Sequence, residues 1–360
     1  MIVYYVWTDI QLLNALNAKI NIHSGKSAAL MVLMLKRVTP DLVDRIEALG
    51  EFVKVIRIQP PTDFGEMPRW KRRIRLFFYG NEYRSYFAKQ IPRDNCSLFV
   101  TSGYWSYALF VLEALYKHNP GLSVMLLDEG IGSYYRTLAR ACQIWPRSCI
   151  EERLTRWMYF GKFGKKAVHL VNGIMAYHPE RVRLECRQKI TLPPLSQNIE
   201  MFRPLLELWR QRDEHMTAEA FLFSMPGLSA EDSAAEEKVW ERLQEHCPES
   251  LRLIHPDMQD DFVGPFEAIC ARRDLSDCLL LGFCSTSMLY PQYFFTQEPY
   301  VMFLHNLMGA ESGLSVREAQ AYMDDLIASY SEPEKIMAPY SIAELDDMLA
   351  KLKLMWGKNK

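Results

Sequence analysis

The sequence lacks the short motifs that mark several common classes of enzyme and metal protein. It contains no Walker loop, no GxGxxG fingerprint, no nucleophile elbow and no cluster of metal-binding histidines. Its eight cysteines form no CxxC pair, which argues against both a zinc site and a disulfide framework. The chemistry of the protein is therefore expected to use neither a metal nor another cofactor.

Targeting and membrane-spanning segments are also missing. The first residues, MIVYYVWTDIQ, have no basic region of the kind that begins a signal peptide, and no apolar run approaches bilayer length. These absences predict a cytoplasmic protein. The formal net charge of −2 gives no general attraction to nucleic acid, and no DNA- or RNA-binding motif occurs, so nucleic acid is not an expected partner.

What the chain does have is an alternation of apolar or β-branched runs with helical patterns, which is typical of parallel sheets covered by helices. Hydrophobic residues make up 49% of its 360 residues, enough for the cores of two domains. Strands are predicted at residues 2–7, 28–35, 52–58, 97–101, 123–127, 168–175, 220–224, 251–254, 278–283 and 300–304. Helices are predicted at residues 40–50, 104–117, 234–245, 286–295, 315–329 and 342–354.

The domain boundary is expected in residues 191–215, a polar segment that begins with prolines and continues in a helical pattern. It would connect two Rossmann-like domains, residues 1–190 and 216–360. Ligands of such domains bind at the carboxyl ends of the strands. Functional residues are therefore expected just after strands, in a central cleft that the two sheets face.

The first candidate motif follows the strand at residues 123–127 and consists of Asp128, Glu129 and Gly130. One carboxylate of this pair could act as the general base for a hydroxyl, and the glycine lets the backbone approach a ligand. The alternative is an acidic turn between a strand and a helix, with Ser133 as the helix N-cap.

A second motif, His255–Pro256, ends the strand at residues 251–254. An imidazole at the carboxyl edge of a sheet can hold or protonate a departing phosphate, although the dipeptide could also be an ordinary turn. The same dipeptide occurs as His178–Pro179, which leads towards the connecting segment and is interpreted as structural.

Three hydroxyl side chains, Ser285, Thr286 and Ser287, follow the apolar strand at residues 278–283 and open the next helix. Hydroxyls and free backbone N–H groups at such a position can bind an anion such as phosphate. The alternative is a plain helix cap.

The loop FSMPGLSAED, residues 223–232, follows the first strand of the second half and contains Ser224, Gly227 and Asp232. Its acidic end could supply a catalytic carboxylate or cap the following helix.

Near the N-terminus, Thr8, Asp9 and Gln11 lie between the first strand and a helix. These polar side chains could contact a sugar acceptor or cap the helix.

Residues 69–80, RWKRRIRLFFYG, combine basic and aromatic side chains. Such a segment can bind an anionic glycan or an anionic membrane surface. A solvated helix with an ordinary buried face explains the same pattern. The segment makes peripheral contact with a membrane one of the open interpretations.

Taken together, the motifs at residues 8–11, 128–130, 255–256 and 285–287 resemble those of bacterial sialyltransferases, and most closely glycosyltransferase family 52. The likeness spans nearly the whole chain, and it lies in the order and placement of motifs that are each two to four residues long. The resemblance implies a fold of the GT-B type, with CMP-sialic acid bound mainly by the C-terminal domain. It also implies transfer with inversion and without a metal.

The resemblance assigns roles to the candidate residues. His255 would contact or protonate the departing phosphate, and Pro256, Ser224, Gly227 and the hydroxyls at 285–287 would complete the nucleotide site. The general base would be Asp128, Glu129 or Asp232. Thr8, Asp9, Gln11 and Gly130 would contact the acceptor.

The acceptor implied is a galactose-terminated lipooligosaccharide, O-antigen or capsule precursor at the inner membrane face. The acceptor itself, the linkage and an arrangement as a homodimer stay open. Two alternatives remain: a glycosyltransferase that uses another nucleotide sugar, and a non-catalytic protein that binds glycans or a membrane surface.

Overall fold

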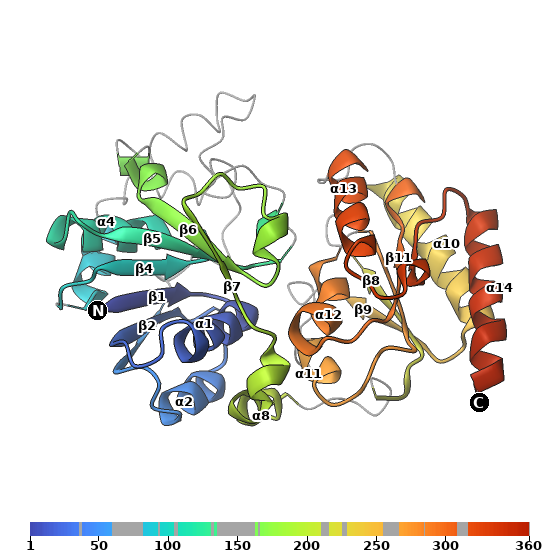
Figure 1. The fold of residues 1–360 in the computed structure, drawn as a ribbon, viewed down its shortest axis with the longest axis horizontal. Helices are drawn as coiled ribbons and strands as arrows, with labels where there is room; N and C mark the ends of the chain where they lie inside the picture. The colour runs from blue at the N-terminus through green and yellow to red at the C-terminus, as the bar shows by residue number, and fades with distance from the viewer. Residues whose placement is uncertain are drawn as a thin grey trace. The chain divides into compact units, whose positions relative to one another are not determined.

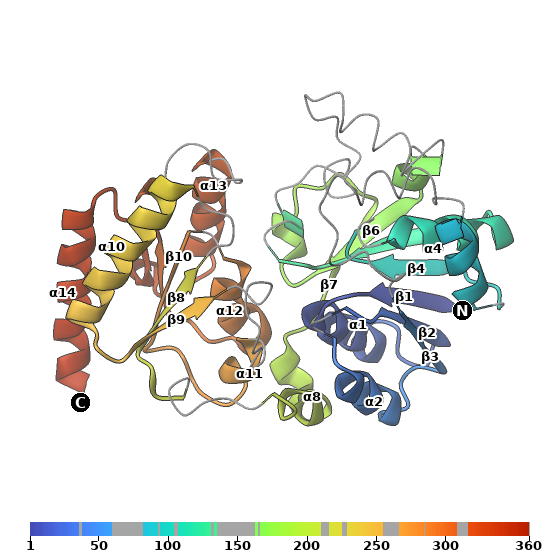
Figure 2. The same cartoon turned by 180° about the vertical axis from the view of Figure 1, so that it is seen from behind.

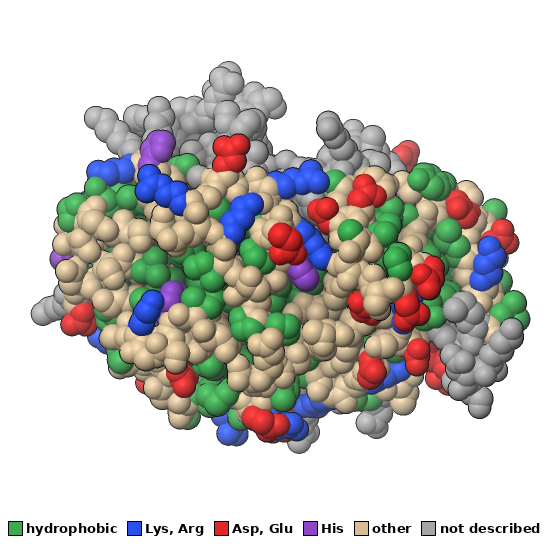
Figure 3. Space-filling model, viewed as in Figure 1, with side chains coloured by type: hydrophobic (Ala, Val, Ile, Leu, Met, Phe, Trp, Pro, Cys, Tyr) green, Lys and Arg blue, Asp and Glu red, His purple; other side chains and the backbone are tan. Residues whose placement is uncertain are grey.

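In a computed structural model the chain forms two compact units, an N-terminal unit Met1–Pro193 and a C-terminal unit Pro194–Lys360 (Figure 1). The structure describes residues 1–35, 38–59, 82–92, 94–103, 107–130, 133–134, 163–164, 166–209, 216–224, 229–254, 266–283, 285–307 and 316–359. Charged side chains of both signs are interspersed on the face that Figure 3 shows.

The N-terminal unit is built on one sheet of seven strands, in which all neighbours run parallel. The spatial order is β3 (Lys54–Ile58), β2 (Ala28–Leu33), β1 (Ile2–Val6), β4 (Leu98–Thr101), β5 (Ser123–Leu127), β6 (Val171–Ala176) and β7 (Gln188–Thr191). From β1 the chain first extends the sheet through β2 and β3, and then returns to β4 on the other side of β1. The strand order therefore reverses between β1 and β4.

Helices form in the N-terminal unit where capping residues interrupt the apolar runs. Thr8 caps α1 (Asp9–Asn21), and Thr39 caps α2 (Pro40–Ala48). Pro40 begins α2, and Gly50, at φ 69°, takes the left-handed conformation just after it. In both views of the ribbon α1 and α2 lie by β1 and β2, and α4 (Ala108–His118) lies by β4 and β5 (Figures 1 and 2).

The C-terminal unit contains a second all-parallel sheet, of five strands. The spatial order is β12 (Ile336–Met337), β11 (Tyr300–Phe303), β10 (Leu279–Gly282), β8 (Ala220–Ser224) and β9 (Ser250–Ile254). Because β8 pairs with β9 on one side and with β10 on the other, this sheet has its own reversal, between β8 and β10.

The helices of the C-terminal unit pack on this sheet through buried aliphatic side chains. α10 (Ala230–His246) and α14 (Ile342–Asn359) lie side by side in both views (Figures 1 and 2). Leu222 and Leu281 from the strands meet Val239 and Leu345 from these helices in one buried cluster. Further helices in the described part of this unit are α8 (Ile199–Leu206), α11 (Glu267–Cys270), α12 (Tyr290–Phe295) and α13 (Val316–Ile327).

Each predicted strand overlaps a strand of the structure, but β7 and β12 were not predicted. β7 reads QKIT and is mostly exposed at the edge of its sheet, and β12 is only two residues long. Neither has the apolar run on which the predictions depended. Residues 286–295 form two elements, the 3₁₀ turn η4 (Thr286–Leu289) and then α12, where one helix was predicted. Residues 191–215, predicted as a connection, include α8.

Within the described ranges, no helix combines the length and the apolar character needed to cross a membrane.

Candidate active site

The carboxyl ends of β1, β4 and β5 lie level with one another in the N-terminal sheet. Tyr5 pairs with Thr101, and Thr101 pairs with Leu126. The residues that follow β1 and β5 therefore leave the sheet at the same edge. This edge includes the strand reversal between β1 and β4, which is where doubly wound folds bind ligands. The motifs at residues 8–11 and 128–130 thus share one edge of the sheet.

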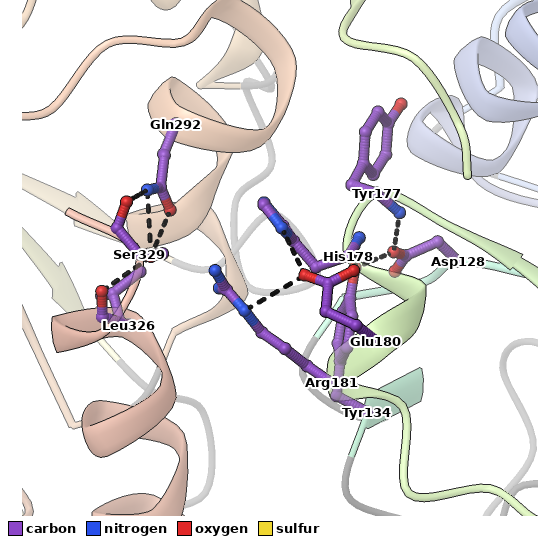
Figure 4. A network of polar contacts seen from close by, with 9 residues as sticks. All are labelled: Asp128, Tyr134, Tyr177, His178, Glu180, Arg181, Gln292, Leu326 and Ser329. Carbon is purple, nitrogen blue, oxygen red and sulfur yellow. Dashed lines mark hydrogen bonds and ion pairs between the residues drawn. The ribbon is translucent and has the colours of Figure 1, made fainter. Parts of the chain in front are cut away.

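Asp128 lies inside the protein at this edge, with 1% of its surface exposed. Its carboxylate accepts hydrogen bonds from the backbone N–H groups of Gly130 (2.7 Å) and Tyr177 (3.2 Å) and from the Tyr134 hydroxyl (Figure 4). Burial raises the pKa of Asp128 to about 6, and the donors around it partly offset that rise. This carboxylate orders the loop after β5 and is too enclosed to meet a substrate hydroxyl.

Glu129 is the more exposed carboxylate of the pair, and Gln11 holds its side chain. The Gln11 Nε2 donates to Glu129 Oε1 at 2.6 Å, while the Gln11 Oε1 accepts from the backbone N–H of Trp7 at 2.9 Å. The backbone N–H of Glu129 donates to Ser133 Oγ at 2.8 Å. These contacts orient a half-buried carboxylate at the edge where a ligand is expected, as a general base requires.

The predicted acceptor-binding residues near the N-terminus mainly contact other parts of the protein. Thr8 Oγ1 accepts from the backbone N–H of Gln11, which is the capping alternative. Asp9 is buried and accepts from the backbone N–H of Ile10. Gln11 is fully buried, so its role here is to position Glu129. Gly130, at φ 94°, supplies the left-handed backbone of the loop.

Two amide side chains of α1 that support this edge, those of Asn14 and Asn17, were not predicted from the sequence. Asn14 Nδ2 donates to the backbone carbonyl of Asp128 at 3.0 Å, and Asn14 Oδ1 accepts from the Tyr177 hydroxyl at 2.6 Å. Asn17 Nδ2 donates to the carbonyl of Pro193 at 2.8 Å. The signal for them was present in the LLNALNA pattern, because two asparagines three residues apart share one face of an otherwise apolar helix.

A cation lies in the turn that follows β6. Arg181, in the 3₁₀ turn η1 (Pro179–Arg181) after β6, places its Nε 3.6 Å from Glu180 Oε1 (Figure 4). Its Nη1 is buried and meets no hydrogen-bond partner among the residues that the structure describes. The neighbouring His178 donates its backbone N–H to the Tyr134 hydroxyl. The His178–Pro179 dipeptide, interpreted as structural from the sequence, therefore lies next to the acidic motif.

In the C-terminal unit, the hydroxyl motif lies at the strand reversal. β8 and β10 are neighbours, with Phe223 opposite Gly282, and the serines follow β10. Ser285 caps η4 and accepts from the backbone N–H of Ser287 at 3.3 Å. All three hydroxyl residues, Ser285, Thr286 and Ser287, are half-buried. This turn, residues 285–287, is called the serine turn below.

The serine turn packs closely on the end of β10 because residue 282 is a glycine. A Cβ at this position would come within 2.9 Å of Met288 Sδ and 3.4 Å of Phe223 Cβ. The absent side chain therefore lets η4 approach the ends of β8 and β10.

Two other predicted residues of this unit are held by internal contacts. Ser224 Oγ donates to Glu236 Oε1 at 2.8 Å and accepts from Arg252 Nε at 2.8 Å. Asp232 lies in the first turn of α10 with 3% of its surface exposed, and its Oδ2 accepts from the hydroxyl of Ser229, the N-cap of that helix. This geometry matches the capping interpretation of Asp232.

The remaining predicted residues lie outside the described part of the chain. These are His255, Pro256 and Gly227, together with the basic and aromatic stretch at residues 69–80. Ile254, the last residue of β9, pairs with Ser224 at the end of β8. Within the described ranges no three His, Cys, Asp or Glu side chains are grouped as metal ligands.

Neither a protein-family model nor a curated protein matches the sequence. Solved structures do match the fold. The chain has a GT-B fold. The MnaA–UDP structure from S. aureus is similar with a TM-score of 0.53 and 9% identity, over 98% of this chain and 87% of that one.

Two plant structures are similar at lower scores. Phytolacca americana UGT2 complexed with UDP-2fluoro-glucose and pterostilbene has a TM-score of 0.49 and 11% identity, over 98% of this chain and 88% of that one. Arabidopsis thaliana UGT89C1 complexed with UDP-L-rhamnose has a TM-score of 0.48 and 10% identity, over 98% and 89%.

Proposed function

We propose that the protein is a glycosyltransferase that takes its sugar from a nucleotide donor, and that this donor is CMP-sialic acid. The observation that carries the proposal is the serine turn at the strand reversal of the C-terminal sheet. The GT-B fold and the UDP named in the similar MnaA structure support a nucleotide-sugar donor in general. The choice of CMP-sialic acid rests on the motifs shared with family 52.

On the donor side, the serine turn binds the phosphate of the nucleotide. During transfer the bond between the anomeric carbon and the phosphate oxygen breaks, and its electron pair leaves with the phosphate. Hydroxyl and backbone N–H donors already in place stabilise the charge that grows there. His255, which follows the end of β9 in sequence, protonates or contacts the same group. Pro256 and Gly227 are further candidates for contact with the nucleotide, and Ser224, the last residue of β8, acts by tying that strand to α10.

On the acceptor side, Glu129 is the general base. It takes the proton from the acceptor hydroxyl as that oxygen forms the new bond to the anomeric carbon, opposite the departing phosphate, so that configuration inverts. Gln11 positions Glu129, and the buried Asp128 shapes the loop that carries it. Asp232 is buried like Asp128 and holds the first turn of α10, so Glu129 is proposed as the base in preference to it. The reaction proposed requires no metal.

The acceptor proposed is a galactose-type hydroxyl of a bacterial surface glycan: lipooligosaccharide, O-antigen or capsule. Arg181 is the residue best placed at the carboxyl edge of the N-terminal sheet to meet an acidic sugar, because its Nη1 is buried without a partner among the described residues. A lipid-linked acceptor would bring the protein to the inner membrane surface, where residues 69–80 would supply positive charge.

The test is to incubate the purified protein with CMP-sialic acid and, separately, with UDP-sugars, and to measure release of CMP or UDP with and without a galactose-terminated acceptor. Acceptor-dependent release of CMP supports the proposal. Release of UDP alone supports the alternative donor. Loss of CMP release in the Ser285→Ala/Ser287→Ala variant, but not in Ser276→Ala, would tie the activity to the serine turn. Ser276 is a suitable control because it precedes β10, at the opposite edge of the sheet.

A non-catalytic role in binding glycans or membranes predicts a different pattern. In that case His255→Ala and Asp232→Ala leave function intact, while charge reversal at Arg72 and Arg73 abolishes it. The catalytic proposal expects His255→Ala to reduce turnover on the order of a hundredfold or more.

A further inference from the structure

Two polar residues beside the serine turn, the buried His305 and the half-buried Asn306, have no role in the site described so far. His305 and Asn306 belong to the 3₁₀ turn η5 (His305–Leu307), which begins two residues after β11 ends. They lie at the carboxyl edge of the C-terminal sheet, where the serine turn also lies. Neither residue belongs to the motifs that the sequence shares with family 52.

Three side-chain nitrogens of this pair are enclosed but unsatisfied. His305 has 4% of its surface exposed, and its ring packs edge-on against Phe303 with 6.3 Å between ring centroids. Neither of its ring nitrogens, nor Asn306 Nδ2, meets a partner at hydrogen-bond geometry in the described part of the chain. Folded proteins seldom leave buried donors and acceptors unpaired, so such groups indicate a bound ligand or water that completes them.

The pairing of the strands places these residues next to the serine turn. Gly282 of β10 is opposite Phe303 of β11, and the backbone N–H of Leu304 donates to the carbonyl of Gly282 at 3.0 Å. Both turns leave neighbouring strands at the same level, and neighbouring strands are about 4.8 Å apart. A molecule whose phosphate lies on the serine turn therefore has its adjoining groups within reach of η5.

The chemistry of the pair narrows the kind of group it recognises. Burial lowers the pKa of His305, and the nearby Gln320 side chain on α13, which does not reach hydrogen-bond geometry with the ring, partly offsets this effect. The imidazole is therefore neutral near pH 7. A neutral imidazole has one donor and one acceptor nitrogen, and the Asn306 amide nitrogen donates. A phosphate only accepts hydrogen bonds at its charged oxygens and would leave the acceptor nitrogen unpaired. A sugar hydroxyl both donates and accepts.

We propose that His305 and Asn306 bind a hydroxyl-bearing part of the donor, either the ribose or the transferred sugar, next to the phosphate on the serine turn. This inference rests on the proposed function, because it takes a nucleotide sugar as the molecule at that edge. It adds a binding pair on β11 to the hydroxyls that follow β10.

The experiment measures the affinity of the full-length protein for CMP, UDP and CMP-sialic acid by calorimetry, in the wild type, His305→Leu and Asn306→Ala. The expected result is that each variant raises the dissociation constant of the bound nucleotide or nucleotide sugar about tenfold, because a hydrogen bond to the ligand is lost. Weaker binding of CMP as well as CMP-sialic acid assigns the contact to the ribose. Weaker binding of CMP-sialic acid alone assigns it to the transferred sugar.

The control is His246→Ala. His246 lies on α10, and its nearest acidic partner is Asp346 at 3.7 Å, so this variant is expected to bind like the wild type. Melting temperatures without ligand separate binding from a structural role. A leucine in place of an unsatisfied buried histidine is expected to leave the melting temperature unchanged or to raise it, whereas a structural histidine would lower it.

Three outcomes would overturn the inference. If the wild type binds a nucleotide and both variants bind it equally well, the pair does not contact the donor and the proposed function stands. Weaker binding that is matched by a lower melting temperature in both variants would mark the pair as structural. If the wild type binds none of the three ligands, the proposed function is wrong, and the inference about His305 and Asn306 is wrong as well.

Discussion

At the scale of single residues, two adjacent carboxylates have different environments and therefore different roles. Asp128 is enclosed by three donors, from Gly130, Tyr134 and Tyr177, while Glu129 is half-buried and its side chain is oriented by the Gln11 amide. Two carboxylates that are adjacent in sequence can differ in burial because the side chains of neighbouring residues leave the backbone in different directions. Only the carboxylate that reaches the surface can exchange a proton with a substrate.

The role of Glu129 can be tested with Glu129→Gln. This change removes the base and keeps the size of the side chain, so turnover is expected to fall on the order of a hundredfold or more, with little change in the substrate KM. Gln11→Ala is expected to cause a smaller loss, because it frees the carboxylate without removing it. Steady-state kinetics of CMP release gives both values. The control is Glu47→Gln, a change at an exposed residue of α2. If Glu129→Gln keeps the wild-type turnover, Glu129 is not the general base.

The buried carboxylate predicts a particular dependence of stability on pH. The folded protein holds the Asp128 proton more tightly than the unfolded chain does, since its pKa is raised to about 6. The stability that this provides is fully present below the ordinary pKa of an aspartate and is lost as the pH rises through about 6. The free energy of unfolding in urea, measured from pH 4 to pH 7, should therefore fall more steeply in the wild type than in Asp128→Asn. Equal slopes would mean that Asp128 is not proton-linked to folding.

At the scale of elements, two glycines in strands allow close contacts of different kinds. Gly173 of β6 is opposite Gln188 of β7, and a Cβ there would come within 2.3 Å of the Gln188 backbone oxygen. At Gly282 the nearest atom is instead the flexible end of Met288. A backbone atom held in a sheet cannot move aside as a methionine side chain can, so the two sites should tolerate a methyl group differently.

We therefore expect Gly173→Ala to destabilise the protein more than Gly282→Ala. Overpacking against backbone should cost roughly 1–3 kcal/mol or more in the free energy of unfolding, measured in urea. Gly282→Ala should cost less stability, because the end of the Met288 side chain can move aside. Equal losses of stability in the two variants would contradict this expectation.

At the scale of the whole molecule, the chain contains two parallel sheets, each with a strand reversal and its own set of functional candidates. The acidic edge belongs to the N-terminal unit and the serine turn to the C-terminal unit. The proposed function assigns the acceptor to the N-terminal unit and the donor to the C-terminal unit.

The division predicts where a nucleotide protects the backbone. Adding CMP should slow amide hydrogen exchange in peptides that cover the serine turn and η5, and should leave the edge strand β3 unchanged. Mass spectrometry of exchanged peptides gives this pattern. Protection centred on the acidic edge of the N-terminal unit would reverse the assignment of donor and acceptor.

The sequence by itself determined the order and approximate bounds of most strands and their division between two parallel sheets, because buried parallel strands need nearly continuous apolar runs that are visible without a structure. The GT-B fold was expected from the resemblance to family 52. It also located the motifs that follow β5 and β10. The short and exposed strands β7 and β12 carried no such run and were missed.

Only the tertiary structure decided which polar residues meet. The contact between Gln11 and Glu129 joins residues 118 positions apart. The enclosure of Asp128 depends on Tyr134 and Tyr177, and the exposure of a side chain depends on neighbours that lie elsewhere in the chain. His305 and Asn306 could be recognised as candidates only in the tertiary structure. Whether a buried polar atom has a hydrogen-bond partner depends on the residues packed around it.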